Sequence, residues 1–317
     1  MGREQERYSR VAVNFPNISS ILTYKHSIDV NRGDLVNVPL GKRKSFGCVI
    51  DSNLKADDLG ESIKGINFKE VGSLVENSIS LNEDELKLYA WISKYYHYGV
   101  GPLIFDSIPK ILKRPRDLEI EKGKGEKLPF KNTDKQQNII NSLLKSFSKG
   151  FTKNYIHGVT GSGKTSIYLS LAKKALSENK SILFLLPEIN LTPQFTSTFL
   201  TFLDCPVFVY HSGVSNSQKF GLWKYLKESN GPLLILGVRS SVFLPISNLG
   251  LVVVDEEHDS SFKQNDRCPY NGRDVAIKKA QIANCPIILG SATPTVENYF
   301  NFSENKMENK YFNIKTR

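Results

Sequence analysis

The sequence predicts an α/β fold, in which a parallel sheet with a phosphate-binding loop follows a smaller β-rich unit. Three observations predict it. Short apolar runs alternate with helical patterns through the second half of the 317 residues, which is typical of parallel strands joined by helices on both faces of a sheet. A glycine-rich loop of the P-loop type lies between one such run and a helical pattern. Residues 10–51 instead contain short strand-like runs separated by Asn, Pro and Gly.

The first unit is predicted to span residues 1–112. Its strand-like runs are 11–13, 21–24, 35–38 and 47–50. A helix that covers or flanks this sheet is predicted from Asn82, because Asn82 is a good N-cap, Glu85 follows three residues later, and Leu86, Tyr89 and Ala90 have helical spacing. The aromatic residues of this region are expected to belong to the core, with base stacking as the alternative: Trp91, Tyr95, Tyr96 and Tyr98.

Residues 113–131 are predicted to form a linker between the two units. The segment is rich in charged residues, contains Gly and Pro, and lacks apolar periodicity. The second unit is then expected over 132–317. Its predicted parallel strands are 181–186, 207–210, 233–236, 251–254 and 287–289.

The segment Gly158 to Thr165 fits GxxxxGK[ST] at every fixed position. In such a loop the glycines let backbone N–H groups surround phosphates, the lysine binds the terminal phosphates, and the final hydroxyl binds Mg²⁺. An apolar stretch at 155–156 precedes the loop and a helical pattern follows it, which is the context that the motif requires. The segment therefore predicts a site for a nucleoside triphosphate and Mg²⁺.

Four residues, Asp255-Glu256-Glu257-His258, directly follow the apolar run 251–254. The carboxyl ends of strands are where an open α/β sheet presents ligand-binding groups. Asp255 is therefore expected to hold the metal ion, and Glu256 to polarise a water molecule. A solvated strand end is the alternative for the acids taken alone. The P-loop elsewhere in the same unit argues against it.

Composition restricts the class of protein. The 42 Lys+Arg against 32 Asp+Glu give a formal charge of +10 and a pI near 9.2, as expected of a partner for phosphate backbones, although a merely soluble basic surface gives the same figures. The four cysteines form no CxxC or Cys/His cluster, which argues against a zinc site or a disulfide framework. No apolar run approaches the ~20 residues of a membrane span, and the charged start does not resemble a signal peptide. These features predict a cytoplasmic protein without membrane contact.

Further segments occur in the order of the helicase motifs. Gln136, in Thr133-Asp134-Lys135-Gln136, lies upstream of the P-loop, where superfamily 2 helicases use a glutamine to recognise adenine. The segments that resemble motifs Ia, Ib, II and III are 186–194, 237–241, 255–258 and 290–294. This resemblance implies that the second unit is a RecA-like helicase lobe 1.

More closely, the chain resembles the PriA family of bacterial replication-restart helicases, also called primosomal protein N-prime. In the second unit the similar segments are 158–165, 187–194, 211–213, 255–264, 270, 273–274 and 290–297. In the first unit, 36–43 and 95–97 resemble the family's domain for the 3′ end of a nascent strand. The resemblance covers almost the whole chain and implies that the β-rich unit binds DNA.

The resemblance implies roles for residues at matching positions. Lys164, Asp255 and Glu256 are expected to be catalytic, and Thr165 and Asp255 to bind Mg²⁺. The residues expected to contact ATP are Gln136, Gly158, Thr160, Gly161, Ser162, Gly163, Lys164 and Thr165. Those expected to contact DNA or to couple it to the nucleotide are Tyr24, Lys42, Arg43, Arg239, Ser240, His258, Phe262, Lys263, Tyr270, Ser291 and Thr293.

The function that the resemblance implies is an ATP-dependent 3′ to 5′ DNA helicase of replication restart and primosome assembly, which recognises branched or forked DNA and single-stranded DNA. The implied protein partners are single-strand binding protein, other primosome proteins and the loader of the replicative helicase. The alternative is a module that binds nucleotide and forked DNA without turnover on its own.

The sequence departs from the family pattern in several places. Thr23 stands where the family's 3′-end pocket has an aspartate, which predicts weaker recognition of a 3′ hydroxyl. Cys268 stands where an aromatic residue is expected, which predicts the loss of one stacking platform. The predicted linker is too short for a winged-helix domain. The second helicase lobe and the zinc module of the family do not follow within these residues, so zinc is not expected in this portion and the chain is expected to hold half of a catalytic site.

Overall fold

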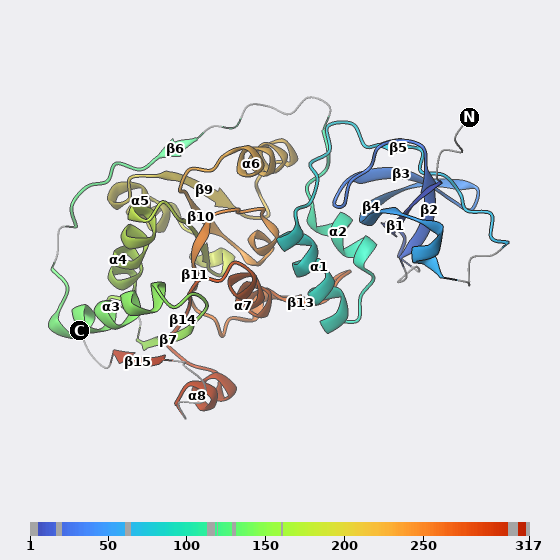
Figure 1. The fold of residues 1–317 in the computed structure, drawn as a ribbon. Helices are drawn as coiled ribbons and strands as arrows, with labels where there is room; N and C mark the ends of the chain where they lie inside the picture. The colour runs from blue at the N-terminus through green and yellow to red at the C-terminus, as the bar shows by residue number, and fades with distance from the viewer. Residues whose placement is uncertain are drawn as a thin grey trace. The chain divides into compact units, whose positions relative to one another are not determined.

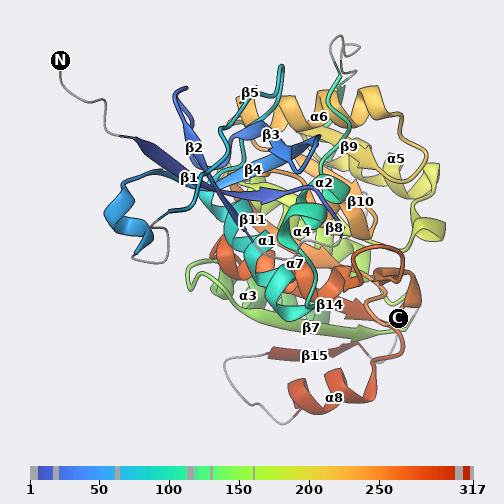
Figure 2. The same cartoon turned by 90° about the vertical axis from the view of Figure 1, so that its right-hand side faces the viewer.

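The computed structural model describes residues 6–16, 21–60, 65–112, 118, 120–128, 131–159, 161–303 and 310–314. The chain forms two compact units (Figures 1 and 2). One unit comprises Met1–Pro115 together with Asn265–Pro269, and the other comprises Arg116–Gln264 and Tyr270–Arg317.

The first unit is built on an antiparallel sheet with the strand order β2-β1-β4-β3-β5. Its strands are β1 (Arg7–Val13), β2 (Leu22–His26), β3 (Leu35–Leu40), β4 (Arg43–Leu54) and β5 (Ser73–Leu74), and a short 3₁₀ helix spans Ala56–Leu59. Valines from three of these strands, Val11, Val36 and Val49, are fully buried in one apolar cluster. The predicted β-rich unit is therefore confirmed.

Two helices complete the first unit, α1 (Glu83–Tyr95) and α2 (Val100–Ser107). The predicted N-cap is confirmed, because Asn82 Oδ1 accepts from the Glu85 N–H at 3.0 Å and Glu85 Oε2 accepts from the Asn82 N–H at 2.8 Å. Tyr89, one of the residues with helical spacing, is buried. Tyr95 is 57% exposed and stacks on Trp91 with ring centroids 4.9 Å apart, so the core prediction is wrong for Tyr95. Trp91, Tyr96 and Tyr98 are only partly buried. Tyr95 is the last residue of α1, and the buried residues of this helix end at Ile92.

The second unit is built on a sheet with the strand order β15-β7-β14-β11-β8-β10-β9-β6. Its neighbouring strands are parallel, except that β6 runs antiparallel to β9. The strands are β6 (Glu121–Lys122), β7 (Lys153–Gly158), β8 (Ser181–Leu185), β9 (Pro206–Tyr210), β10 (Leu234–Gly237), β11 (Leu249–Val254), β14 (Ile287–Ser291) and β15 (Lys310–Ile314). The helices are α3 (Asp134–Phe147), α4 (Lys164–Ser177), α5 (Pro193–Phe202), α6 (Asn216–Glu228), α7 (Gly272–Ile282) and α8 (Val296–Ser303). Shorter elements are 3₁₀ turns at Glu188–Asn190, Arg239–Phe243 and Ser260–Phe262, and a two-strand ladder of β12 (Lys263–Gln264) and β13 (Tyr270–Asn271).

The central strands are buried on both faces. Every residue of β8, β10 and β11 is buried, which requires cover on both sides because successive side chains point to opposite faces. Residues of α3, α4 and α5 join the main apolar cluster of this sheet, and α7 also contacts β11. The predicted parallel sheet with a P-loop is confirmed.

The segment predicted as a linker is partly attached to the second unit. Glu121 and Lys122 pair with Val207 and Pro206 at the edge of the sheet, and the N–H groups of Gly123 and Lys124 donate to carbonyls of the second unit at 2.9 and 2.7 Å. These contacts use the backbone and leave charged side chains exposed. The segment therefore lacks the apolar periodicity that would reveal a strand.

No helix among the described residues is long and apolar enough to span a bilayer. The cysteines are free thiols, and each of them is buried.

Candidate nucleotide-binding site

The loop between β7 and α4 has the backbone that a phosphate-binding loop requires. Gly161 and Gly163 have φ values of 76° and 88°, in the left-handed region that glycine adopts without strain. A Cβ atom at Gly163 would also lie 2.1 Å from Gln136 Nε2, so a larger residue would displace that side chain in addition to straining the backbone. The helix α4 begins directly after this loop, and its first N–H groups and its dipole favour an anion. Thr160, a predicted ligand of the nucleotide, lies outside the described residues.

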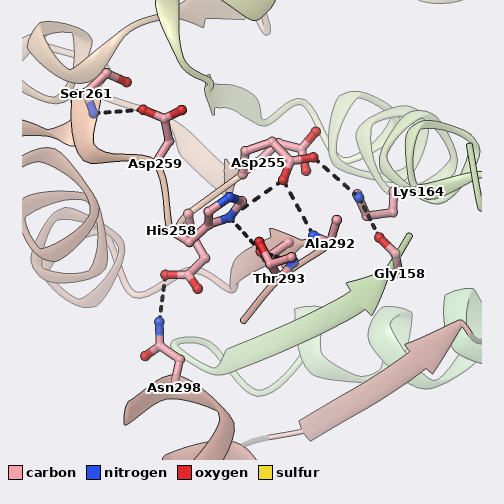
Figure 3. A network of polar contacts seen from close by, with 12 residues as sticks. Gly158, Lys164, Asp255, His258, Asp259, Ser261, Ala292, Thr293 and Asn298 are labelled. Atoms are coloured by element: carbon pink, nitrogen blue, oxygen red, sulfur yellow. Dashed lines mark hydrogen bonds and ion pairs between the residues drawn. The ribbon is translucent and has the colours of Figure 1, made fainter. Parts of the chain in front are cut away.

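Lys164, the lysine of this loop, is buried, and its ammonium group contacts oxygen atoms of the protein. Lys164 is 7% exposed, and its Nζ donates to the Gly158 carbonyl at 2.7 Å and lies 3.5 Å from Glu256 Oε1 (Figure 3). Ser162 is also buried, and its Oγ has no hydrogen-bond partner within the described part of the chain. A buried ammonium with a nearby hydroxyl and an adjacent helix N-terminus fits the phosphates of a nucleotide.

Asp255 lies at the carboxyl end of β11, as predicted, and is tied to the P-loop helix. The Tyr168 hydroxyl, which belongs to α4, donates to Asp255 Oδ1 at 3.0 Å, and the Asp255 N–H donates to Leu185 O at 2.9 Å. Burial raises the pKa of Asp255, and the Lys164 ammonium opposes this rise. A carboxylate beside the hydroxyl-bearing first turn of α4 is the donor set that Mg²⁺ prefers. The role of Thr165 and Asp255 as Mg²⁺ ligands stays a prediction.

Glu256 has an uncommon backbone conformation, with φ at 48°. A left-handed conformation costs a non-glycine residue about 1–3 kcal/mol and persists only where neighbouring contacts enforce it. The carboxylate of Glu256 approaches Lys164 on one side, and its Oε2 lies 3.7 Å from His258 Nδ1 on the other. Such strain often accompanies a functional site.

The structure brings the predicted coupling residues of motifs II and III together. His258 Nδ1 and Ser291 Oγ lie 2.7 Å apart, and the Thr293 N–H donates to Ser291 Oγ at 3.0 Å (Figure 3). Ser291 is fully buried at the end of β14, beside β7. The two motifs are therefore linked by a direct hydrogen-bond chain that begins next to Glu256.

Gln136 contacts the P-loop directly. Its Nε2 donates to the Ser162 carbonyl at 3.3 Å, while its Oε1 accepts from the Thr133 N–H at 2.9 Å in a capping box at the start of α3. The glutamine therefore lies at the rim of the candidate site, where it was predicted.

Three residues predicted to contact DNA have other roles in this structure. Arg239 Nη1 donates to the carbonyls of Ser261 and Lys263 at 2.8 and 2.6 Å. These bonds stabilise the position of the segment 261–263, which follows motif II. Phe262 is 1% exposed, and Tyr270 is 9% exposed against Phe243. Both rings are packed in this conformation, and their role in DNA contact or coupling stays a prediction. Aromatic residues near a motif carry no sequence signal that separates packing from stacking.

Of the residues of the first unit that were predicted to contact DNA, one is buried and two are exposed. Tyr24 is 3% exposed within the valine cluster, and its hydroxyl donates to Pro39 O at 3.1 Å, so its ring offers no surface to DNA here. Lys42 and Arg43 lie exposed at the turn between β3 and β4. These two cations remain accessible to a phosphate backbone.

Sequence reasoning missed three residues that shape the site. Tyr168 holds Asp255, and Glu257 with Arg273 forms a buried ion pair at 2.9 Å. Tyr168 lies four residues after Lys164, on the same side of α4, which is a signal that could have been used. Nothing in the local sequence pairs Glu257 with Arg273.

Comparisons with known proteins agree with this geometry. The family model described as "Type III restriction enzyme, res subunit" matches residues 129–296, which is more than half of the chain, and a model of a 3′ DNA-binding domain, PriA_3primeBD, matches residues 10–109. Replication restart protein PriA of Treponema pallidum (strain Nichols) is 33% identical over 279 residues, 87% of this chain and 42% of that protein. The PriA of Bacillus subtilis (strain 168) is 39% identical over 198 residues, 62% of this chain and 24% of that protein.

A solved structure, RecG bound to a three-way DNA junction, has 19% identity and a TM-score of 0.44 over 60% of this chain and 24% of that one. The fold and the site define the class, a P-loop lobe of the helicase type, and the chain belongs to the family that the first model describes. Its two matched domains and its relatives further place it in the PriA group of replication restart proteins. The chain spans less than half of the length of these relatives.

Proposed function

We propose that this chain provides the ATP-binding lobe and the 3′-end DNA-binding domain of an ATP-dependent 3′ to 5′ DNA helicase of replication restart. One observation carries the proposal: Lys164 of the P-loop lies 3.5 Å from Glu256 of motif II, and α4 holds Asp255 through Tyr168. These are the groups that phosphoryl transfer requires on one side of a nucleotide. The proposed domains are 1–112 and 132–317.

In this proposal the residues of the loop bind and orient the nucleotide. The N–H groups of 161–165 surround the phosphates, Lys164 neutralises the terminal phosphates, and Gln136 contacts adenine. Thr165 and Asp255 would hold Mg²⁺, which would supply positive charge to the phosphates. Glu256 orients the attacking water and accepts its proton.

The hydrogen-bond chain from His258 to Ser291 and Thr293 supports a coupling role. A shift of the Glu256 carboxylate on nucleotide binding changes the position of His258, 3.7 Å away, and thereby the segment after β14. Exposed cations, among them Lys42 and Arg43, together with the formal charge of +10, support contact with forked and single-stranded DNA. Primosome proteins, single-strand binding protein and a helicase loader are proposed as partners from the family membership.

The proposal is tested by ATP hydrolysis with and without forked DNA. We expect at most weak hydrolysis by this chain alone, stimulated by forked DNA, and no hydrolysis by Lys164→Ala. Lys174→Ala is the matched control, because Lys174 lies on the same helix with its side chain 43% exposed and pairs with Glu178. Saturable binding of nucleotide and DNA without hydrolysis in the unaltered chain would instead support the binding-module alternative.

A further inference from the structure

Glu257, the residue after the proposed base Glu256, is buried, and both of its carboxylate oxygens accept hydrogen bonds. The Glu257 side chain is 0% exposed. It accepts hydrogen bonds from the Tyr155 hydroxyl at 2.7 Å, from Arg273 Nη1 at 2.9 Å and from Asn298 Nδ2 at 2.6 Å. Figure 3 shows the contact made by Asn298. We infer that Glu257 is a positioning residue that holds Glu256 in its left-handed backbone conformation, an inference that rests on the proposed ATPase function.

The three donors come from different parts of the second unit. Tyr155 belongs to β7, which leads into the P-loop, Arg273 to α7, and Asn298 to α8. Because three elements converge on one carboxylate, the position of Glu257 is determined independently of its chain neighbours. Arg273 also donates to Asp274 at 3.1 Å, so its guanidinium is itself oriented.

The backbone around Glu256 is held at both ends. The N–H of Asp255 donates to Leu185 O at 2.9 Å, and the N–H of Glu257 donates to Gly290 O at 3.0 Å. Between these two fixed residues, Glu256 adopts a φ of 48°. Without the side-chain partners of Glu257, the two backbone hydrogen bonds alone hold this peptide, which can then relax to a conformation with negative φ. The Glu256 carboxylate then moves away from Lys164 and from the water that it orients.

A substitution by glutamine tests the network with little change in shape. A carboxylate accepts all three hydrogen bonds and carries the charge that pairs with Arg273. The glutamine amide is neutral and has one oxygen acceptor, so in Glu257→Gln its NH₂ either faces the Arg273 and Asn298 donors or requires the Tyr155 hydroxyl to turn and accept, and in both cases the ion pair with Arg273 is lost. The matched control is Glu228→Gln, which makes the same chemical change at an exposed residue whose carboxylate lies 3.9 Å from Lys224. Leu226→Ala, in the buried face of α6, is the control for general loss of stability.

Backbone hydrogen exchange of the whole chain reports local opening of the segment around Glu256, and it does not require ATP hydrolysis. In Glu257→Gln we expect amides of 255–258 and 292–298 to exchange at least about tenfold faster, with β8 unchanged, whereas Leu226→Ala raises exchange throughout the second unit. ATP hydrolysis is expected to fall at least about tenfold in kcat, with the affinity for a fluorescent ATP analogue within about threefold of the unaltered chain. Glu228→Gln is expected to change neither quantity.

A second variant covers the case in which Glu257→Gln does not fold. Tyr155→Phe removes one of the three hydrogen bonds and retains the ring that packs on Phe302, so we expect smaller changes in the same segments. Unchanged exchange at 255–258 in the variants, or an increase spread evenly over the unit, would overturn the inference. If the unaltered chain binds ATP without hydrolysing it, the result favours the binding-module alternative to the proposed function, and the exchange result still tests the role of Glu257.

Discussion

Removal of one hydroxyl from Tyr168 should weaken the connection between the P-loop helix and motif II. Tyr168 is 1% exposed and donates to the Asp255 carboxylate at 3.0 Å, and the phenyl ring introduced by Tyr168→Phe fills nearly the same space. A hydrogen bond to a charged group contributes about 1.5–3 kcal/mol, and its loss leaves the buried carboxylate with fewer partners. For a unit of this size such a loss corresponds to a thermal midpoint lower by about 3–12 °C.

The assay can be confined to the second unit. The chain contains two tryptophans, and only Trp223, which is 2% exposed in α6, belongs to that unit. Thermal and urea unfolding are therefore followed by Trp223 fluorescence in a Trp91→Phe background, with and without the Tyr168→Phe substitution. The affinity for Mg²⁺-nucleotide should fall as well, because Asp255 loses the bond that orients it. An unfolding midpoint and an affinity both equal to those of the background chain would refute the role assigned to this hydroxyl.

The remaining predictions concern the nucleotide, the thiols and DNA. Lys164→Ala should weaken nucleotide affinity by about 10- to 150-fold, because a charge-assisted contact with phosphate is lost, and equal affinity in a titration would contradict the assignment. Glu256→Gln should bind nucleotide normally but lose any hydrolysis that the unaltered chain shows, and retained turnover would exclude Glu256 as the base. Burial raises the pKa of the Cys48, Cys205 and Cys285 thiols to about 12, so at pH 8 an aromatic disulfide reagent should label them only when the chain unfolds. Log affinity for forked DNA should fall linearly with log salt concentration, and a salt-independent affinity would argue against binding through the basic surface.

The sequence by itself determined the elements whose requirements are local. The P-loop could be located because its glycines, lysine and hydroxyl satisfy backbone and charge demands within eight consecutive positions, and the structure shows Gly161 and Gly163 in the left-handed conformations that this demands. The acidic motif could be placed because a fully apolar run ends directly before Asp255. The N-cap at Asn82 was recognisable because its partner, Glu85, is three residues away.

Only the tertiary structure decided which distant side chains complete the site. Glu257 meets Tyr155 across 102 positions, Arg273 across 16 and Asn298 across 41, and no local periodicity records such contacts. Phe262 was predicted to contact DNA or to couple it to the nucleotide, and its ring is buried. Local patterns report what the backbone of one segment requires. The partners of a buried charge or ring depend on which elements the packing of the sheet brings to it, and that follows from the whole fold.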